Sequence, residues 1–138
     1  MSRKVGIAVA VFAIVALTAT TVWAGSPHFV GKTTITRTGN SLTVSGKIAG
    51  LGNETQVEVQ ITVEAQCVNP GGNEPAADNK ESFSAAGTFP VQNGKANYTL
   101  TVTAVFQPNC SGPMTIEFSN LTVTDVSHGI SQFFPGPF

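Results

Sequence analysis

The sequence predicts an all-β domain, namely an immunoglobulin-like antiparallel β-sandwich of about seven strands with one disulfide. Three observations lead to this fold class. Apolar and polar residues alternate with the two-residue period of strands that are dry on one face, and such a sheet needs a second layer to cover it. Gly, Pro and Asn separate these stretches, and none repeats with a helical period. The 138-residue chain has two cysteines, enough for one bridge.

Residues 1–24 are predicted to be a signal peptide. Arg3 and Lys4 precede an apolar or small run at 5–17, and 22–24 ends in the small residue of a cleavage site. The run is short of the roughly 20 residues that cross a bilayer, so no permanent membrane anchor is expected. Residues 25–138 are predicted to form a single secreted domain.

Residues 29–38 and 41–48 are predicted to be the first two strands, joined by a two-residue turn at Gly39-Asn40. Pairing across this turn places Ile35 opposite Val44 and Thr36 opposite Thr43. Apolar side chains then meet apolar ones and polar meet polar, which specifies the register.

Residues 55–67 form the most regular predicted strand. Its odd positions are apolar, and they are Val57, Val59, Ile61, Val63 and Ala65. Cys67 continues this parity and should point into the core. In an exported chain, a Cys67–Cys110 disulfide is favoured over a metal site or a nucleophile. It would tie the strand to the loop "QPNCSGP" and stabilise the fold by roughly 4 kcal/mol in the chain-entropy account.

Residues 82–91 and 95–106 are predicted to form a second hairpin, because Asn93-Gly94 suits a type I′ turn. Pairing across this turn places Phe89 opposite Tyr98 and Phe83 opposite Ala104. Both faces of the resulting ribbon match.

The last two predicted strands are 114–118 and 121–126. Apolar residues keep one parity up to Phe118 and have switched parity by Leu121. A β-bulge at Ser119-Asn120 would produce this switch.

The tail at 130–138 is rich in aromatic residues and proline, and it allows two interpretations. It can fold back over an open sheet edge or the end of the core. Alternatively, Phe133, Phe134 and Phe138 form an exposed apolar patch for a partner.

Two stretches of the sequence carry a family resemblance. The segment "SGKIAGLGNETQVEV" before one cysteine and "NGKANYTLTV" before the other resemble the layout of neocarzinostatin-type apoproteins. That resemblance implies a small secreted sandwich that binds an apolar chromophore in a cleft. The family carries two disulfides, whereas this chain can form one.

The segment "TDVSHG" brings Asp125, Ser127 and His128 within four residues. Triads are assembled from residues distant in sequence, so we expect a solvated strand end rather than a Ser/His hydrolase. His28 and His128 are both expected to be exposed. They lack metal-ligand spacing, and no metal or other cofactor is predicted.

Other polar features have plain interpretations. The carboxylates Glu74, Asp78 and Glu81 lack the regular spacing of a calcium loop. Outward threonines could order water as ice-binding surfaces do, but threonine is also simply a good strand residue; they include Thr99, Thr101 and Thr103. Four asparagines are candidate glycosylation sites in Asn-X-Ser/Thr sequons. They are Asn53, Asn97, Asn109 and Asn120.

Charge and motif content together suggest a binding role. After signal removal, five Lys and Arg face eight Asp and Glu, and composition indicates no basic patch of the kind that nucleic acid or anionic lipid would reward. We therefore predict a secreted, non-enzymatic extracellular binding or structural module for an unidentified extracellular or cell-surface partner. The alternatives are a carrier of a small apolar ligand and a hydrolase inhibitor that presents "QPNCSGP".

Overall fold

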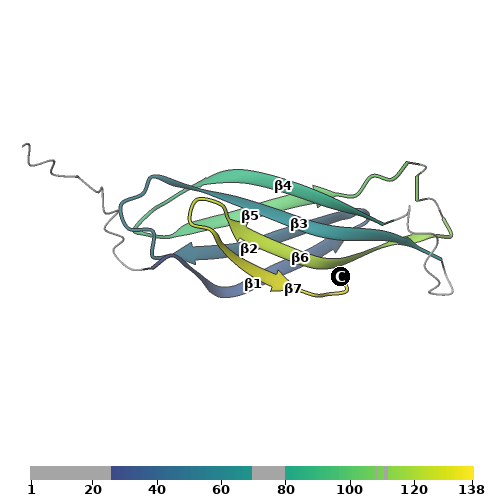
Figure 1. The fold of residues 1–138 in the computed structure, drawn as a ribbon, viewed down its shortest axis with the longest axis horizontal. Helices are drawn as coiled ribbons and strands as arrows, with labels where there is room; N and C mark the ends of the chain where they lie inside the picture. The colour runs from purple at the N-terminus through teal and green to yellow at the C-terminus, as the bar shows by residue number, and fades with distance from the viewer. Residues whose placement is uncertain (1–25, 70–79, 108, 111) are drawn as a thin grey trace, which may run out of the picture.

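The computed structural model describes residues 26–69, 80–107, 109–110 and 112–138, and the predicted signal peptide lies outside them (Figure 1). The described residues form seven strands and no helix. The strands are β1 (His28–Thr38), β2 (Ser41–Ala49), β3 (Gln56–Val68), β4 (Lys80–Pro90), β5 (Ala96–Thr103), β6 (Thr115–Asp125) and β7 (Ile130–Phe134). The predicted all-β sandwich is confirmed.

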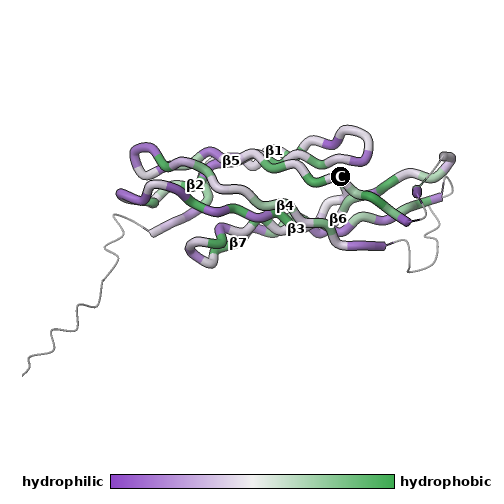
Figure 2. Tube along the Cα trace, turned by 90° about the horizontal axis from the view of Figure 1, so that it is seen from above, coloured by the Kyte–Doolittle hydropathy of each residue, from purple (hydrophilic) through white to green (hydrophobic). Residues whose placement is uncertain are grey.

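The strands form two antiparallel sheets that pack as two layers (Figure 2). One sheet has the order β1-β2-β5 and the other has the order β4-β3-β6-β7. In the seven-strand immunoglobulin plan the first, second and fifth strands share one sheet, and the third, sixth and seventh share the other. This chain follows that plan, except that its fourth strand pairs with the third instead of joining the first sheet.

The core lies between the sheets and is centred on β3. All five odd positions from Val57 to Ala65 are fully buried, and β3 has a neighbour on each side. Side chains of the facing sheet and of β6 complete the core. The largest of them are Leu42, Val44, Ile48, Tyr98, Leu100, Val102, Phe118, Leu121 and Val123.

The two predicted hairpins have different outcomes. The first is confirmed, since Ile35 pairs with Val44 and Thr36 with Thr43. The second is wrong beyond its turn: Phe89 pairs with Val57 and Tyr98 pairs with Gly46, in different sheets.

The turn between β4 and β5 nevertheless has the predicted form. Asn93 and Gly94 have φ values of 54° and 74°, which a type I′ turn requires. Gln92 and Lys95 form the only bridge described between the two flanking segments, and the strands then diverge into opposite layers. Phe89 and Tyr98 still meet, because their rings pack edge to face across the core with centroids 6.4 Å apart.

The predicted bulge lies inside a single strand, β6, rather than between two strands. Thr62 of β3 pairs with Thr122, whereas Glu64 pairs with Ser119, so the register of β6 against β3 shifts between these two pairs. Asn120 adopts φ 52°, a conformation that asparagine tolerates better than most residues. Its Nδ2 donates to Glu64 Oε2 at 2.8 Å, and this bond lowers the pKa of Glu64.

The C-terminal tail continues the sheet. Residues Ile130–Phe134 form β7 along the edge of β6, and the Phe138 amide donates to the Phe118 carbonyl at 2.9 Å. Arg37 of β1 donates to the Phe138 carbonyl at 3.2 Å and lies over the Phe118 ring. The tail thus joins an edge of each sheet.

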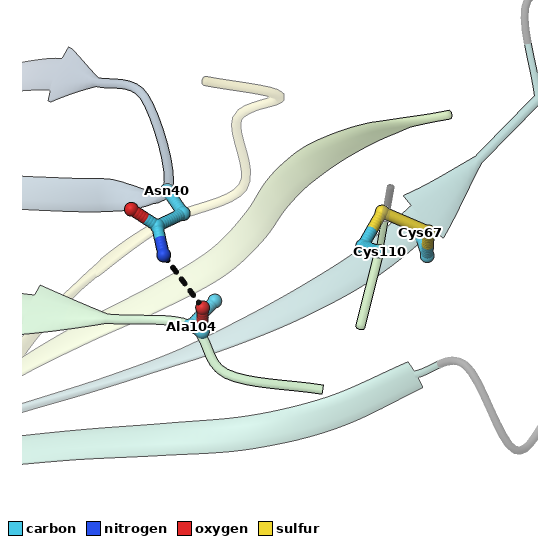
Figure 3. The surroundings of a disulfide bond; sticks show 4 residues. All are labelled: Asn40, Cys67, Ala104 and Cys110. Atoms are coloured by element: carbon cyan, nitrogen blue, oxygen red, sulfur yellow. Dashed lines mark hydrogen bonds between the residues drawn. A yellow bond between two sulfur atoms is a disulfide. The ribbon is translucent and has the colours of Figure 1, made fainter. Parts of the chain in front are cut away.

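The Cys67–Cys110 disulfide is present at the opposite end of β3 from the β2–β3 connection (Figure 3). Cys67 is buried, as its parity predicts. Near this bridge Asn40 Nδ2 donates to the Ala104 carbonyl at 3.2 Å, and the Ala104 amide donates to the Asn40 carbonyl at 2.9 Å. These bonds attach the β1–β2 turn to the end of β5.

Gly46 of β2 allows the largest buried side chain of the core to fit. Tyr98 is 1% exposed, and a Cβ on Gly46 would overlap its hydroxyl. Glycine at a strand interior commonly marks such a close approach. Burial raises the pKa of Tyr98, with Thr33 acting in the opposite direction.

We therefore expect Gly46→Ala to lower the free energy of unfolding by about 1–3 kcal/mol, the usual cost of overpacking a core. Chemical denaturation would measure it. Gly112→Ala is the matched control, because a Cβ there meets nothing within 4 Å. Equal stability of the two variants would contradict the packing described for Tyr98.

Candidate functional site

Three connections meet at one end of the sandwich, and together they are called the loop end here. They are residues 50–55 between β2 and β3, 91–95 between β4 and β5, and 126–129 between β6 and β7. Figure 1 shows all three at the same end of the long axis. Backbone bonds link the first two of these connections: the Leu51 amide donates to the Gly94 carbonyl at 2.9 Å, and the Val91 amide donates to the Thr55 carbonyl at 3.0 Å.

Asp125, His128 and Glu54 form a polar cluster within the loop end. The Asp125 side chain is 0% exposed and that of His128 is 2% exposed. His128 Nδ1 lies 2.7 Å from Asp125 Oδ2, and its Nε2 lies 2.8 Å from Glu54 Oε2. The His128 amide also donates to Asp125 Oδ1 at 3.1 Å. The cluster joins the β6–β7 turn to the β2–β3 connection.

The cluster favours a charged His128. A neutral imidazole has one N–H, whereas both ring nitrogens here face carboxylate oxygens, so only the imidazolium can donate on both sides. Burial lowers the pKa of His128, but hydrogen bonds to Asp125 and Glu54 and the charges of these carboxylates outweigh it. The net effect is a raised pKa.

The expectation of a solvated strand end at "TDVSHG" is therefore wrong for Asp125 and His128. Asp125 continues the inward parity of Leu121 and Val123, and this signal was available in the sequence. Glu54, 74 residues from His128, carried no such signal. His28 is exposed as expected, and its Nδ1 lies 2.6 Å from the Ser26 carbonyl oxygen.

Ser127 is used structurally. Its hydroxyl accepts a hydrogen bond from the Glu58 amide at 3.0 Å, while the Val126 amide donates to the Glu58 carbonyl at 2.9 Å. These bonds fasten the β6–β7 turn to the start of β3. The serine, histidine and aspartate are thus close in space, but both ring nitrogens of His128 face carboxylate oxygens.

Three open hollows surround the loop end. The first, of about 760 Å³, is lined by residues of the β2–β3 and β4–β5 connections, including Glu54, Asn93 and Lys95. The second, of about 520 Å³, lies on the outer face of β1-β2-β5, and a third of about 370 Å³ adjoins it. Lys95 lines all three, and Lys47 and Asn97 line the second and third.

A bulge in β1, which the alternation did not predict, contributes residues to the lining of the second hollow. Between Val30 and Thr34, three residues of β1 lie opposite the single residue Gly46 of β2. Gly31 adopts φ 71° in this bulge, a conformation suited to glycine. Bulges re-aim side chains, and here Lys32 lines the hollow with Lys47.

The outward threonines of β5 belong to a wider hydroxyl surface. Thr99, Thr101 and Thr103 are exposed and pair with hydroxyl residues of β2. Side-chain oxygens meet across the strands at 2.9–3.0 Å, in the pairs Thr99–Ser45, Thr101–Thr43 and Thr103–Ser41. This surface borders the second hollow through Ser45.

The remaining predicted residues are dispersed. Of the predicted aromatic patch, Phe133 is 60% exposed, whereas Phe134 and Phe138 pack against the core. Glu74 and Asp78 lie outside the described residues, and Glu81 is exposed on β4. The four sequon asparagines, Asn53, Asn97, Asn109 and Asn120, are all exposed.

The described part of the chain contains no group of three or more His, Cys, Asp or Glu side chains placed to bind a metal ion. No helix within it reaches the length and hydropathy of a membrane span.

Comparison with protein-family models, curated proteins and solved structures found no significant match.

The Asp125–His128–Glu54 cluster predicts a pH-dependent stability. Folding raises the pKa of His128 above its ordinary value near 6.5. The charged ring therefore contributes its full stabilisation of the folded state below about pH 6.5, and this stabilisation is lost as the pH rises through the raised pKa. We expect His128→Asn to lower the free energy of unfolding by about 2–3 kcal/mol near pH 6, as for a hydrogen bond to a charged group, and by less near pH 9. Denaturation across this range would measure it.

His28→Asn is the control for this measurement, because His28 is exposed and contacts only a nearby carbonyl. It should follow the parent protein at every pH. A stability difference for His128→Asn that stays constant with pH would show that the charge of the ring contributes nothing.

Proposed function

We propose that the chain is a secreted, non-enzymatic binding module that engages its partner through the loop end. The observation that carries this proposal is the group of three adjoining hollows that share Lys95. Binding residues concentrate on connections held by a rigid scaffold, and concave sites with a few convergent polar groups are typical ligand sites.

The arrangement of titratable groups supports binding rather than hydrolysis. An activated nucleophile needs its hydroxyl within hydrogen-bonding reach of a base. Ser127 Oγ instead accepts the Glu58 amide, and His128 is held between the carboxylates of Asp125 and Glu54. Ser127 and His128 thus serve to position the chain at the loop end.

Export is supported by two features of the sequence. Arg3 and Lys4 precede the apolar run at 5–17, as in a secretory signal peptide. The Cys67–Cys110 disulfide is of the kind that persists in oxidising compartments. An extracellular or cell-surface partner follows from this location.

The lining of the hollows favours a polar ligand. An apolar carrier, as the neocarzinostatin-type resemblance implies, would need large apolar side chains around its cleft. The second hollow is instead lined mainly by lysine, glycine, hydroxyl and amide residues. An inhibitor would present the loop at 107–113, in which 108 and 111 lie outside the described residues.

Blocking the loop end tests the proposal. A polyethylene glycol chain attached at Asn53→Cys would cover the first hollow, whereas the same chain at Gln107→Cys lies at the opposite end of the sandwich. We expect the first conjugate to lose at least about tenfold in retention on the isolated cell envelope of the producing organism, as when central contacts of an interface are blocked. The second should bind like the unmodified mature chain.

Equal retention of the two conjugates, or no retention of the unmodified chain, would contradict the proposal. Intact mass measurement of each conjugate before the assay would verify that the Cys67–Cys110 bridge has survived labelling.

A further inference from the structure

The second hollow concentrates positive charge in a chain whose overall charge is negative. Five Lys and Arg follow residue 25, and three of them, Lys32, Lys47 and Lys95, line this hollow. No aspartate or glutamate is among its lining residues. The absence of a basic patch that composition suggested is therefore wrong for this face.

The three lysines also form no ion pair within the described residues. Lys80 pairs with Glu64 at 3.4 Å, and Arg37 donates to the Gly39 and Phe138 carbonyls. Within the described residues, no ion pair or side-chain hydrogen bond engages Lys32, Lys47 or Lys95. Like charges gathered without carboxylates repel one another and create a local potential that attracts an anion.

The backbone fixes the positions from which these lysine side chains project before any ligand binds. Lys47 lies on β2 directly opposite Asn97 of β5, and Lys95 lies two residues before Asn97. Lys32 lies in the β1 bulge, next to Gly31 in its left-handed conformation, and lines the same hollow. A preorganised site loses less entropy on binding than one assembled from mobile loops.

The other lining groups narrow the ligand class. Thr34, Ser45 and Asn97 offer hydroxyl and amide groups that can hydrogen-bond sugar hydroxyls. No aromatic side chain lines the hollow, whereas nucleic-acid grooves combine positive charge with aromatic rings on which bases stack. The adjoining third hollow shares Lys47, Lys95 and Asn97, so a ligand with several anionic groups can continue past them.

From this arrangement we infer that the hollow lined by Lys32, Lys47 and Lys95 binds the sulfate or carboxylate groups of an acidic polysaccharide. The inference rests on the proposed function, since it names the ligand class for the loop end. The lysines supply charge, and the neighbouring hydroxyl and amide groups recognise the sugar.

Calorimetric titration of the mature chain with dextran sulfate, uncharged dextran and polyglutamate tests this inference. The parent protein should bind dextran sulfate, with affinity that falls as salt rises, and should not bind dextran. Lys47→Gln with Lys95→Gln should weaken dextran sulfate binding about tenfold, as expected for two surface ion pairs. Both lysines are exposed, so melting temperature should be unchanged.

Lys80→Glu is the matched control, because it changes net charge by the same two units at a lysine that does not line the hollow. It should leave the affinity within about twofold, the scale of a remote screened charge. Equal weakening by both variants would overturn the inference, because it would indicate attraction by net charge alone. Polyglutamate binding as tight as dextran sulfate would also overturn it, in favour of an acidic peptide.

The two proposals fail in different ways. If polyethylene glycol at residue 53 blocks envelope retention but the parent chain ignores dextran sulfate, the ligand class is wrong and the loop-end proposal stands. If neither conjugate loses retention while the lysine variant loses dextran sulfate binding, the anion site is real but the loop end is not the attachment surface.

Discussion

The dry inner face of β3 is the constraint on which the rest of the structure depends. Five of its side chains, from Val57 to Ala65, have no exposed surface, and the strand lies inside its sheet with β4 and β6 as neighbours. Such a face is stable only under a second layer, which β2 and β5 supply. β5 must therefore lie across from β3 and β4, although only a short turn separates it from β4.

The two ends of this frame are closed by different chemistry. At the far end a covalent bridge joins β3 to the segment before β6, and Asn40 ties the β1–β2 turn to Ala104. At the loop end a buried carboxylate and an imidazole, Asp125 and His128, hold the chain through charge-assisted hydrogen bonds. The loop-end closure holds Glu54, and the Leu51–Gly94 backbone bond ties the same connection to the β4–β5 turn beside the hollows around Lys95.

Local features were predictable from the sequence, and spatial neighbours were not. The Gly39-Asn40 register, the type I′ turn at Asn93-Gly94 and the parity of Cys67 each depend on a few adjacent residues, and all are confirmed. The alternation of apolar and polar residues indicates which face of a strand is buried. It cannot distinguish a strand that pairs with β5 in the same sheet from one that faces β5 across the core. The contact of Glu54 with His128 and the position of Lys95 near Lys47 depend on that choice, so neither could be predicted.

Net charge is a poor guide to the electrostatic potential of so small a surface. Salt screens exposed charges beyond about 8–10 Å, so three lysines on one face set the local potential there and distant carboxylates do not cancel it. The position of a bound anion is therefore the decisive observation. The direct measurement is a crystal structure of the mature chain with a short sulfated oligosaccharide. It should show sulfate oxygens within hydrogen-bonding distance of Lys47 and Lys95 Nζ, with the β2–β5 backbone unmoved. A ligand seated against Phe133, or elsewhere on the β4-β3-β6-β7 face, would contradict it.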